Sequence, residues 1–143
     1  MNDAALTVAE ANRLLEANFA PWVKALNLAI EECGRDGVTM RMAYSEELCR
    51  VGGLISGQAL MALADTCMVF VASAALGRWT PVATTNQNTS FLRPAVGRDV
   101  IARGRALKAG RSLVFGEVTL TVEGDERPVA HVTSTCAVPA SGG

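Results

Sequence analysis

One stretch of almost uncharged residues constrains most strongly what this chain can fold into. Between Ala59 and Leu76 there are eighteen residues, of which only Asp65 carries a charge. Ser56, a residue type that caps helix N-termini, precedes the stretch, and Gly77, a typical helix terminator, follows it. A helix that is apolar on nearly every side is stable in water only when other elements surround it. The sequence therefore predicts a long core helix.

A membrane-spanning helix is the alternative interpretation, because the stretch approaches the length of a span. An aspartate near the middle of a span costs about 2.5–3.5 kcal/mol on insertion scales. Most of the other residues are Ala, Thr, Ser or Cys, and no basic cluster flanks the stretch. We therefore expect a soluble core helix and no contact with a membrane.

The segment before the apolar stretch predicts one helix and two strands. Apolar residues recur at helical spacing over residues 4–18, where Thr7 caps the helix and Pro21 ends it. A strand is expected around residues 26–32. A second is expected over residues 38–44, where alternation places on one face Val38, Met40, Met42 and Tyr44.

The segment after the apolar stretch predicts four strands. Residues 83–92 are rich in Thr and polar on both faces, which suits a strand that lines a groove. Residues 100–107, 113–123 and 129–138 are joined by hairpin-sized links and form an antiparallel meander. The expected fold class is α+β, with one long central helix wrapped by a curved antiparallel sheet of five or six strands. Residues 1–143 form one domain, with an N-terminal helical region at 1–20 and a frayed tail at 139–143.

Charge is distributed unevenly along the chain. The net charge of −1 argues against a nucleic-acid-binding protein that relies on global charge. Residues 1–70 have a balance of −4 and residues 71–143 one of +3, with six basic residues between Arg93 and Arg111. This basic stretch is either the solvated face of a strand and its turn or a site for a phosphate-bearing ligand.

The cysteines and the single histidine bear on location and metal binding. No two cysteines have CxxC spacing, and the acidic start of the chain lacks the features of a secretory signal. We expect a cytoplasmic protein in which Cys33, Cys67 and Cys136 are small core residues. A zinc site would have to be assembled from scattered cysteines and His131, so we expect no metal and no cofactor. His131 is expected on the polar face of the last strand.

Four segments, taken together and in order, resemble a known family. They are GLISGQ at residues 53–58, LAD at 63–65, TSFLRPA at 89–95 and KAGRSL at 108–113. They resemble the hotdog-fold acyl-CoA thioesterases of the phenylacetate-degradation (PaaI-like) type. The resemblance implies a homodimer with a continuous sheet, often paired into a homotetramer. It also implies metal-independent hydrolysis of acyl-CoA thioesters.

The resemblance assigns roles to individual residues. Asp65 matches the family's catalytic acid, and Gly57 matches the glycine whose backbone N–H holds the thioester carbonyl oxygen. Thr84 falls near a Ser or Thr that assists the water in some members. The chain departs from the family at two places: Ser56-Gly57-Gln58 stands where His-Gly-Gly is frequent, and Arg50 where Asn is frequent. Ser56 and Arg50 are candidate substrate-binding residues.

The chemistry of the residues agrees with these roles. Thioester hydrolysis needs an activated water or a carboxylate nucleophile, together with donors aimed at the developing oxyanion. The N–H groups of Gly57 and Gln58 have no intrahelical partner and lie at the positive end of the helix dipole. Asp65 is the candidate base or nucleophile; the alternative is a buried acid bonded to a neighbouring strand.

Helix geometry places the two groups apart. Gly57 and Asp65 are eight residues apart, about 12 Å along a helix axis. One carbonyl group cannot contact both, so groups that act on the same thioester must come from different subunits. We therefore expect a symmetric dimer with two equivalent sites.

The CoA part and the acyl group of an acyl-CoA would need separate contacts. Arg93, Lys108 and Arg111 are the candidate phosphate contacts because turns project long side chains, whereas Arg103 and Arg105 suit the outer face of a strand. The candidate apolar pocket residues are Met61, Met68, Phe70 and Leu92. Two other functions stay open: a non-catalytic acyl-CoA binder or sensor, and a hydratase or dehydratase that would pair His131 with a carboxylate.

Overall fold

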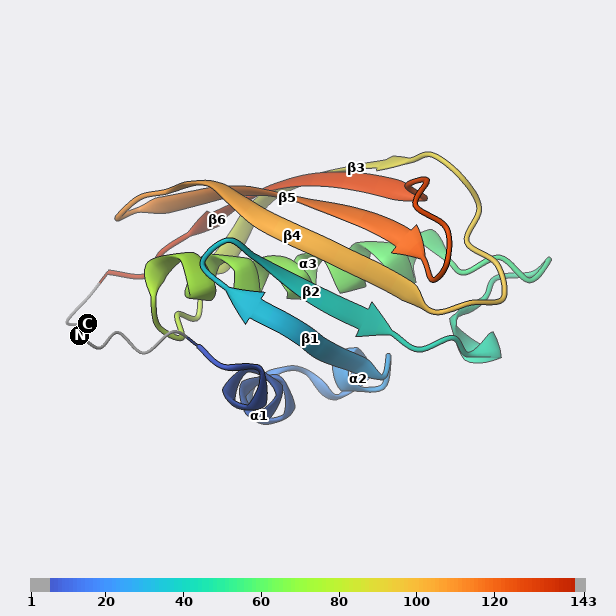
Figure 1. Ribbon diagram of the computed structural model, residues 1–143, viewed down its shortest axis with the longest axis horizontal. Helices are drawn as coiled ribbons and strands as arrows, with labels where there is room; N and C mark the ends of the chain where they lie inside the picture. Colours follow the sequence, from blue (N-terminus) through green and yellow to red (C-terminus); the bar gives the residue numbers. More distant parts are fainter. Residues whose placement is uncertain (1–5, 141–143) are drawn as a thin grey trace.

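The computed structural model describes residues 6–140 and packs one antiparallel sheet over one long helix (Figure 1). The sheet order is β1–β2–β4–β5–β6–β3. Its strands are β1 (Leu28–Gly34), β2 (Gly37–Met42), β3 (Ala83–Phe91), β4 (Val100–Ala109), β5 (Leu113–Val122) and β6 (Ala130–Ala137). The helices are α1 (Val8–Asn18), α2 (Pro21–Lys24), the 3-10 turn η1 (Glu46–Leu48) and α3 (Gly57–Leu76). The predicted α+β fold with a wrapped central helix is confirmed.

The ends of α3 are set by the two residues that the sequence indicated. The Ser56 hydroxyl accepts a hydrogen bond from the Ala59 N–H at 3.2 Å, which caps the N-terminus. Gly77 adopts the left-handed conformation with φ 85° and stops the helix. By length and composition α3 passes as a membrane span, yet 72% of its most apolar window is buried inside the protein. It is the core helix of the sheet.

Two glycines of the sheet let α3 approach its inner face closely. A Cβ atom added at Gly104 on β4 would lie 2.7 Å from Val71 Cγ2, and one added at Gly116 on β5 would lie 2.6 Å from Met68 Sδ. Val71 and Met68 both project from α3 and are buried. Side chains at these two positions would therefore hold α3 farther from the sheet.

One face of α3 is not covered, contrary to the expectation of a helix enclosed on nearly every side. Gln58 and Met61 are exposed, and Ala62 and Asp65 are half-buried, so these residues form an open stripe at helical spacing. The other faces carry the twelve buried residues of the helix. The single charged residue of α3 therefore lies on the face that the sheet leaves open.

The N-terminal elements differ from the prediction in their boundaries. Thr7 and Glu10 form a capping box, so α1 begins at Val8; residues 4 and 5 of the expected helix lie outside the described residues. Pro21 follows α1 as predicted, but it is also the first residue of α2, a short helix that the prediction missed. β1 begins two residues later than expected because α2 and the left-handed Asn27 (φ 57°) occupy the intervening residues.

The alternation predicted that Tyr44 shares the buried face of β2, but in the structure it does not. Val38, Met40 and Met42 are buried, but β2 ends at Met42. The Tyr44 N–H then donates to Asp99 Oδ1 at 2.7 Å, which turns the chain away from the sheet. At the other end, the described part of the expected tail, residues 139–140, has no regular structure; residues 141–143 lie outside the described residues.

Arg41 joins three acidic residues on the outer face of the sheet. Its guanidinium lies 2.6 Å from Glu31 Oε2, 3.0 Å from Asp99 Oδ2 and 3.1 Å from Glu123 Oε2. The hydrogen bond from the Tyr44 N–H and that from Arg41 lower the pKa of Asp99 below its ordinary value of 3.8. This cluster ties β1, β2 and the segments that flank β4 and β5.

The cysteines lie in or near the core. Cys67 and Cys136 are buried as predicted, whereas Cys33 is only half-buried, because the end of β1 is less covered than the centre of the sheet. Burial raises the pKa of the Cys67 thiol to about 12, and it also raises the pKa values of Cys33 and Cys136. All four cysteines are free.

Gly104→Ala tests the close packing of α3 on the sheet. The added methyl group would clash with Val71 and press on Cys67 and Val118, so we expect a loss of about 1–3 kcal/mol in the free energy of unfolding. Gly34→Ala is the matched control, because nothing lies within 4 Å of its added Cβ. Both substitutions reduce the entropy of the unfolded chain, so their difference in urea denaturation isolates packing. Equal stability of the two variants would contradict this account.

Arg41→Met tests the acidic cluster and its pH dependence. Methionine keeps an apolar stem but removes the ion pairs, so we expect a loss of about 1–3 kcal/mol at pH 7. Because folding lowers the pKa of Asp99, its contribution is present above 3.8 and is lost as the pH falls through the folded-state pKa. The stability gap between wild type and variant, measured by urea denaturation, should narrow from pH 7 to pH 3. A gap that does not change with pH would remove Asp99 from the explanation.

Candidate active site

Asp65 lies in a groove along the open face of α3. The groove has a volume of about 350 Å³ and is lined by Trp22, Gln58, Met61, Ala62, Asp65, Thr84 and Gln87. Its walls come from α2, α3 and β3, and most of the surface they expose is apolar. The helical spacing of Gln58, Met61 and Asp65 explains why these side chains share this face.

Thr84 fixes the carboxylate of Asp65. The Thr84 hydroxyl donates a hydrogen bond to Asp65 Oδ1 at 2.7 Å across the gap between β3 and α3. Asp65 is therefore bonded to a neighbouring strand, as the alternative interpretation expected of a structural acid, but it is half-exposed in a groove rather than enclosed in the core. A half-exposed carboxylate with one oxygen held by a donor is accessible to a substrate. The structure brings together these two of the predicted residues.

The N-terminus of α3 lines a second groove. This groove has a volume of about 450 Å³, and its lining residues are Arg50, Leu54, Ile55, Gly57, Leu60, Phe91, Leu92, Arg93, Pro94 and Ala95. The Phe91 ring lies over Gly57, where an added Cβ would be 3.2 Å from the ring. Ser56 uses its hydroxyl as the helix cap, whereas the Gln58 side chain lines the groove of Asp65. Gly57 and Asp65 thus line different grooves of one chain.

The predicted phosphate contacts are divided between the two ends of the sheet. Arg93 and Arg50 line the groove at the N-terminus of α3; each guanidinium also donates to a backbone carbonyl, that of Pro128 at 3.0 Å and that of Val51 at 3.1 Å. Lys108 lies near the end of β4, where it pairs with Phe115, and not in the turn as predicted. Arg111 belongs to the β4–β5 turn, which lies beyond the other end of α3 (Figure 1). In a single chain the basic residues therefore do not form one site. Arg93 precedes β4 and Lys108 lies near the end of β4, so the length of the strand separates them.

The pocket predicted from apolar residues is corrected in part. Met61 is 41% exposed and lines the groove of Asp65. Leu92 lines the second groove, while Met68 and Phe70 are fully buried core residues. β3 lines the groove through Thr84 and Gln87, as its polar composition predicted, whereas Trp22 was missed because no local pattern indicated that α2 would reach the open face of α3. Within residues 6–140, no three His, Cys, Asp or Glu side chains gather into a metal site.

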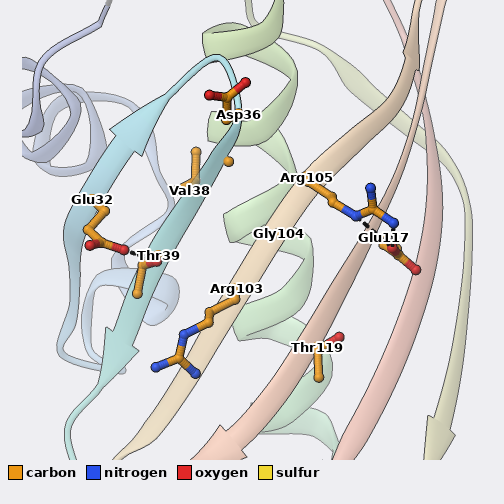
Figure 2. Close-up of a pocket in the computed structure, with 10 residues that line it drawn as sticks. Glu32, Asp36, Val38, Thr39, Arg103, Gly104, Arg105, Glu117 and Thr119 are labelled. Atoms are coloured by element: carbon orange, nitrogen blue, oxygen red, sulfur yellow. Dashed lines mark hydrogen bonds and ion pairs between the residues drawn. The ribbon is translucent and has the colours of Figure 1, made fainter.

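A third hollow, of about 400 Å³, lies on the outer face of the sheet (Figure 2). Arg103 and Arg105 project there from β4, on the outer face as predicted. Their neighbours include Glu32, Thr39 and Glu117; Thr39 donates to Glu32 at 2.7 Å, and Arg105 pairs with Glu117 at 2.7 Å. Arg103 donates to the Thr121 hydroxyl at 3.2 Å, so Arg105 and Glu117 form the one ion pair among the described residues that line this hollow.

His131 belongs to the same outer face. Its Nε2 lies 3.0 Å from Glu117 Oε1, so the histidine does have the carboxylate partner that hydratase chemistry would require. The hydrogen bond with His131, and then that from Arg105, lower the pKa of Glu117 and keep it ionised. The pair lies across the sheet from the groove of Asp65, because β5 and β6 direct the neighbouring residues inward to the core. The pair that the hydratase alternative requires is therefore present, but it lies outside the groove of Asp65.

A match to a family model identifies the protein family of this chain. The model of the thioesterase superfamily matches residues 52–129, which is more than half of the chain. The chain belongs to the thioesterase superfamily. The match includes α3 with Asp65 and β3 with Thr84. Hydrolysis of acyl thioesters is the activity that this membership supports.

Solved structures agree with the family and the hotdog fold. A protein from Silicibacter sp. TM1040 that is predicted to be a thioesterase is 34% identical, over 96% of this chain and 94% of that one, with a TM-score of 0.85. The Escherichia coli PaaI protein of the phenylacetic acid degradation operon is 16% identical, over 93% and 96%, with a TM-score of 0.79. A hypothetical thioesterase from Streptococcus pneumoniae TIGR4, solved with coenzyme A, is 21% identical, over 80% and 87%, with a TM-score of 0.72. The last two show the fold alone.

Proposed function

We propose that this thioesterase-superfamily protein is an acyl-CoA thioesterase that releases the free acid and CoA and acts as a homodimer. The observation that carries the proposal is the hydrogen-bonded pair of Asp65 and Thr84 in an apolar groove. A carboxylate beside an apolar groove offers both the reactive group and a place for the acyl chain. The Streptococcus pneumoniae relative solved with coenzyme A supports CoA as the thiol part of the substrate.

Asp65 acts on the thioester carbonyl in one of two ways. As a general base it takes a proton from water while the water oxygen attacks the carbonyl carbon. As a nucleophile its oxygen forms an anhydride, which water then hydrolyses. In both routes the C–S bond breaks, the sulfur leaves as the CoA thiolate, and backbone N–H groups stabilise the oxyanion. Because Thr84 holds Oδ1, Oδ2 is the oxygen that we assign to the reaction.

A second copy of the chain would supply the oxyanion donor, and the edge of the sheet supports this arrangement. Among the strands of residues 6–140, β3 pairs with β6 alone, and its nine residues contain no charged residue and no proline. At the opposite edge, β1 carries Glu31 and Glu32 and packs against α1. Unprotected edge strands are sites of pairing, whereas charge and covering elements block them. We therefore propose that two β3 strands pair antiparallel to give a continuous sheet.

The symmetry of such a pair has a direct consequence for the site. Gln87 is the middle residue of β3, so a two-fold axis near it would bring the partner's Phe91 beside Ala83. The Phe91 ring lies over Gly57 within each chain, and Thr84 beside Ala83 holds Asp65. The partner's Gly57 would therefore approach Asp65. This arrangement resolves the separation of the two groups along one helix.

The same two-fold axis would reunite the divided basic residues. Leu113 at the start of β5 is in register with Ala137, which pairs with Ala83, so the β4–β5 turn lies at the Ala83 end of the sheet. The partner's Arg93 would arrive at this end, together with the partner's Arg50. Lys108 and Arg111 would lie about 15–20 Å away, three to four strand spacings along the sheet. These groups suit the diphosphate and 3′-phosphate of CoA.

We further propose a cytoplasmic location and a route that uses no metal or cofactor. The four free cysteines suit a reducing compartment. The chemistry assigned to Asp65, to Thr84 and to the helix N-terminus is sufficient for hydrolysis. Pairing of dimers into a homotetramer remains a proposal that the family resemblance suggests.

Asp65→Asn tests the assigned chemistry. The amide keeps the shape of the side chain but cannot accept a proton or form an anhydride, so we expect turnover to fall by about 10²-fold or more with little change in stability. Thiol release from a panel of acyl-CoAs, followed with a thiol reagent, measures this. Asp36→Asn, an exposed acid in the β1–β2 turn, is the matched control and should stay within about twofold of wild type. Wild-type turnover in Asp65→Asn would refute the mechanism.

The same thiol-release assay on the wild-type protein distinguishes the thioesterase from a non-catalytic acyl-CoA binder or sensor. Binding of acyl-CoA without thiol release at any chain length would favour the binder.

Arg111→Ala tests the phosphate contacts. An exposed charge contact is worth about 1 kcal/mol, so the KM for acyl-CoA should rise about fivefold, and the effect should weaken as salt increases. The KM for an acyl-pantetheine, which lacks the nucleotide, should stay unchanged. Arg13→Ala, an exposed arginine on α1, is the control. Equal effects on both substrates would show that Arg111 supports the fold instead.

A further inference from the structure

Trp22 is an exposed aromatic residue beside the proposed catalytic carboxylate. Its side chain is 63% exposed, although tryptophan is among the residues that gain most from burial. It lines the same groove as Asp65 and Thr84, although β1, β2 and η1 lie between it and α3 in the sequence. Together with the exposed Met61 in the same groove, the indole forms a continuous apolar surface, which is typical of a contact site for an apolar group.

The backbone that carries Trp22 is anchored on both sides. Before it, Phe19 packs on Phe70 and Trp79 of the core, with ring centroids 5.6 Å and 6.4 Å apart. After it, Val23 is buried, and the Lys24 ammonium group donates to the Glu16 carbonyl at 3.1 Å. Because its neighbours hold α2 in place, the indole is presented to the groove by a fixed element rather than by a loose loop.

The groove residues next to Trp22 leave room for an apolar occupant. Met61 is 41% exposed and offers a flexible thioether surface, while Ala62 is too small to fill the space. Gln87 donates its amide to the Met61 carbonyl at 3.2 Å, so its polar head is directed to the backbone. The groove runs from Asp65 towards α2 without a charged residue other than Asp65.

We propose that Trp22 is a specificity-determining residue that covers the acyl group of the thioester held at Asp65 of the same chain. Trp22 thereby selects apolar acyl groups longer than acetyl. The occupant is the acyl group because the groove is continuous with the proposed catalytic pair, and the inference rests on the proposed thioesterase function. Burial of each methylene group against such a surface is worth about fourfold in kcat/KM.

The test compares hexanoyl-CoA with acetyl-CoA in Trp22→Ala and Trp22→Phe. We expect the ratio of the two kcat/KM values to fall about tenfold in Trp22→Ala, whereas acetyl-CoA hydrolysis stays within about twofold. Trp22→Phe keeps an aromatic face and should retain the ratio within about threefold. Phe115→Ala, an aromatic residue 39% exposed on the outer face of β5, is the control and should leave the ratio unchanged. An unchanged ratio in Trp22→Ala, or equal losses for both substrates, would overturn the proposal.

A binding measurement separates this inference from the proposed function. The chain has two tryptophans, so a non-hydrolysable hexanoyl-CoA thioether should change the emission of the wild type but not that of Trp22→Phe. If the wild type shows this change but releases no thiol from any acyl-CoA, the hydrolytic function is wrong and the acyl contact of Trp22 is supported. If the thioether changes neither protein, the assignment of Trp22 is refuted.

Discussion

The seating of α3 against the inner face of the sheet is the interaction on which the rest of the structure depends. Most side chains of α3 are apolar and gain from burial, and Gly104 and Gly116 let the helix approach the strands closely. Once these contacts are made, the rotation of α3 about its own axis is fixed. That rotation decides which residues remain outside the core, and Asp65 is the charged residue among them.

The position of Asp65 follows from the same packing. A carboxylate on a buried face would need a partner charge or several donors, whereas on the open face it needs only partial compensation. Thr84 provides one donor from β3 and leaves the rest of the group accessible. The groove therefore combines a positioned acid with apolar walls, which is the combination that an acyl thioester requires.

The sequence was sufficient to predict the elements whose signals are local. Ser56 and Gly77 indicated both ends of α3, Thr7 indicated the start of α1, and alternation indicated the meander of β4, β5 and β6. Features that depend on tertiary contacts were not predicted. Trp22 lies on a helix of four residues, too short for any periodicity, and the separation of Arg93 from Lys108 depends on the direction of β4. The late start of β1 relative to the prediction also depends on α2.

The roles of the site residues rest on the family resemblance together with helix geometry. Spacing alone predicted that Gly57 and Asp65 lie apart, and the structure places them in separate grooves. Spacing could not indicate which face of α3 stays open, because nearly every residue of the helix is apolar or small. That face is set by where β3 and α2 pack.

The burial of the cysteines has a consequence for a protein whose proposed product is a thiol. CoA released at the groove can exchange with disulfides, and a thiolate on the enzyme would be open to mixed disulfide formation. Burial raises the pKa of Cys67 to about 12 and raises the pKa values of Cys33 and Cys136. These thiols stay protonated at neutral pH and are poor nucleophiles. The core can therefore use sulfur for packing while remaining inert to the redox state of the CoA pool.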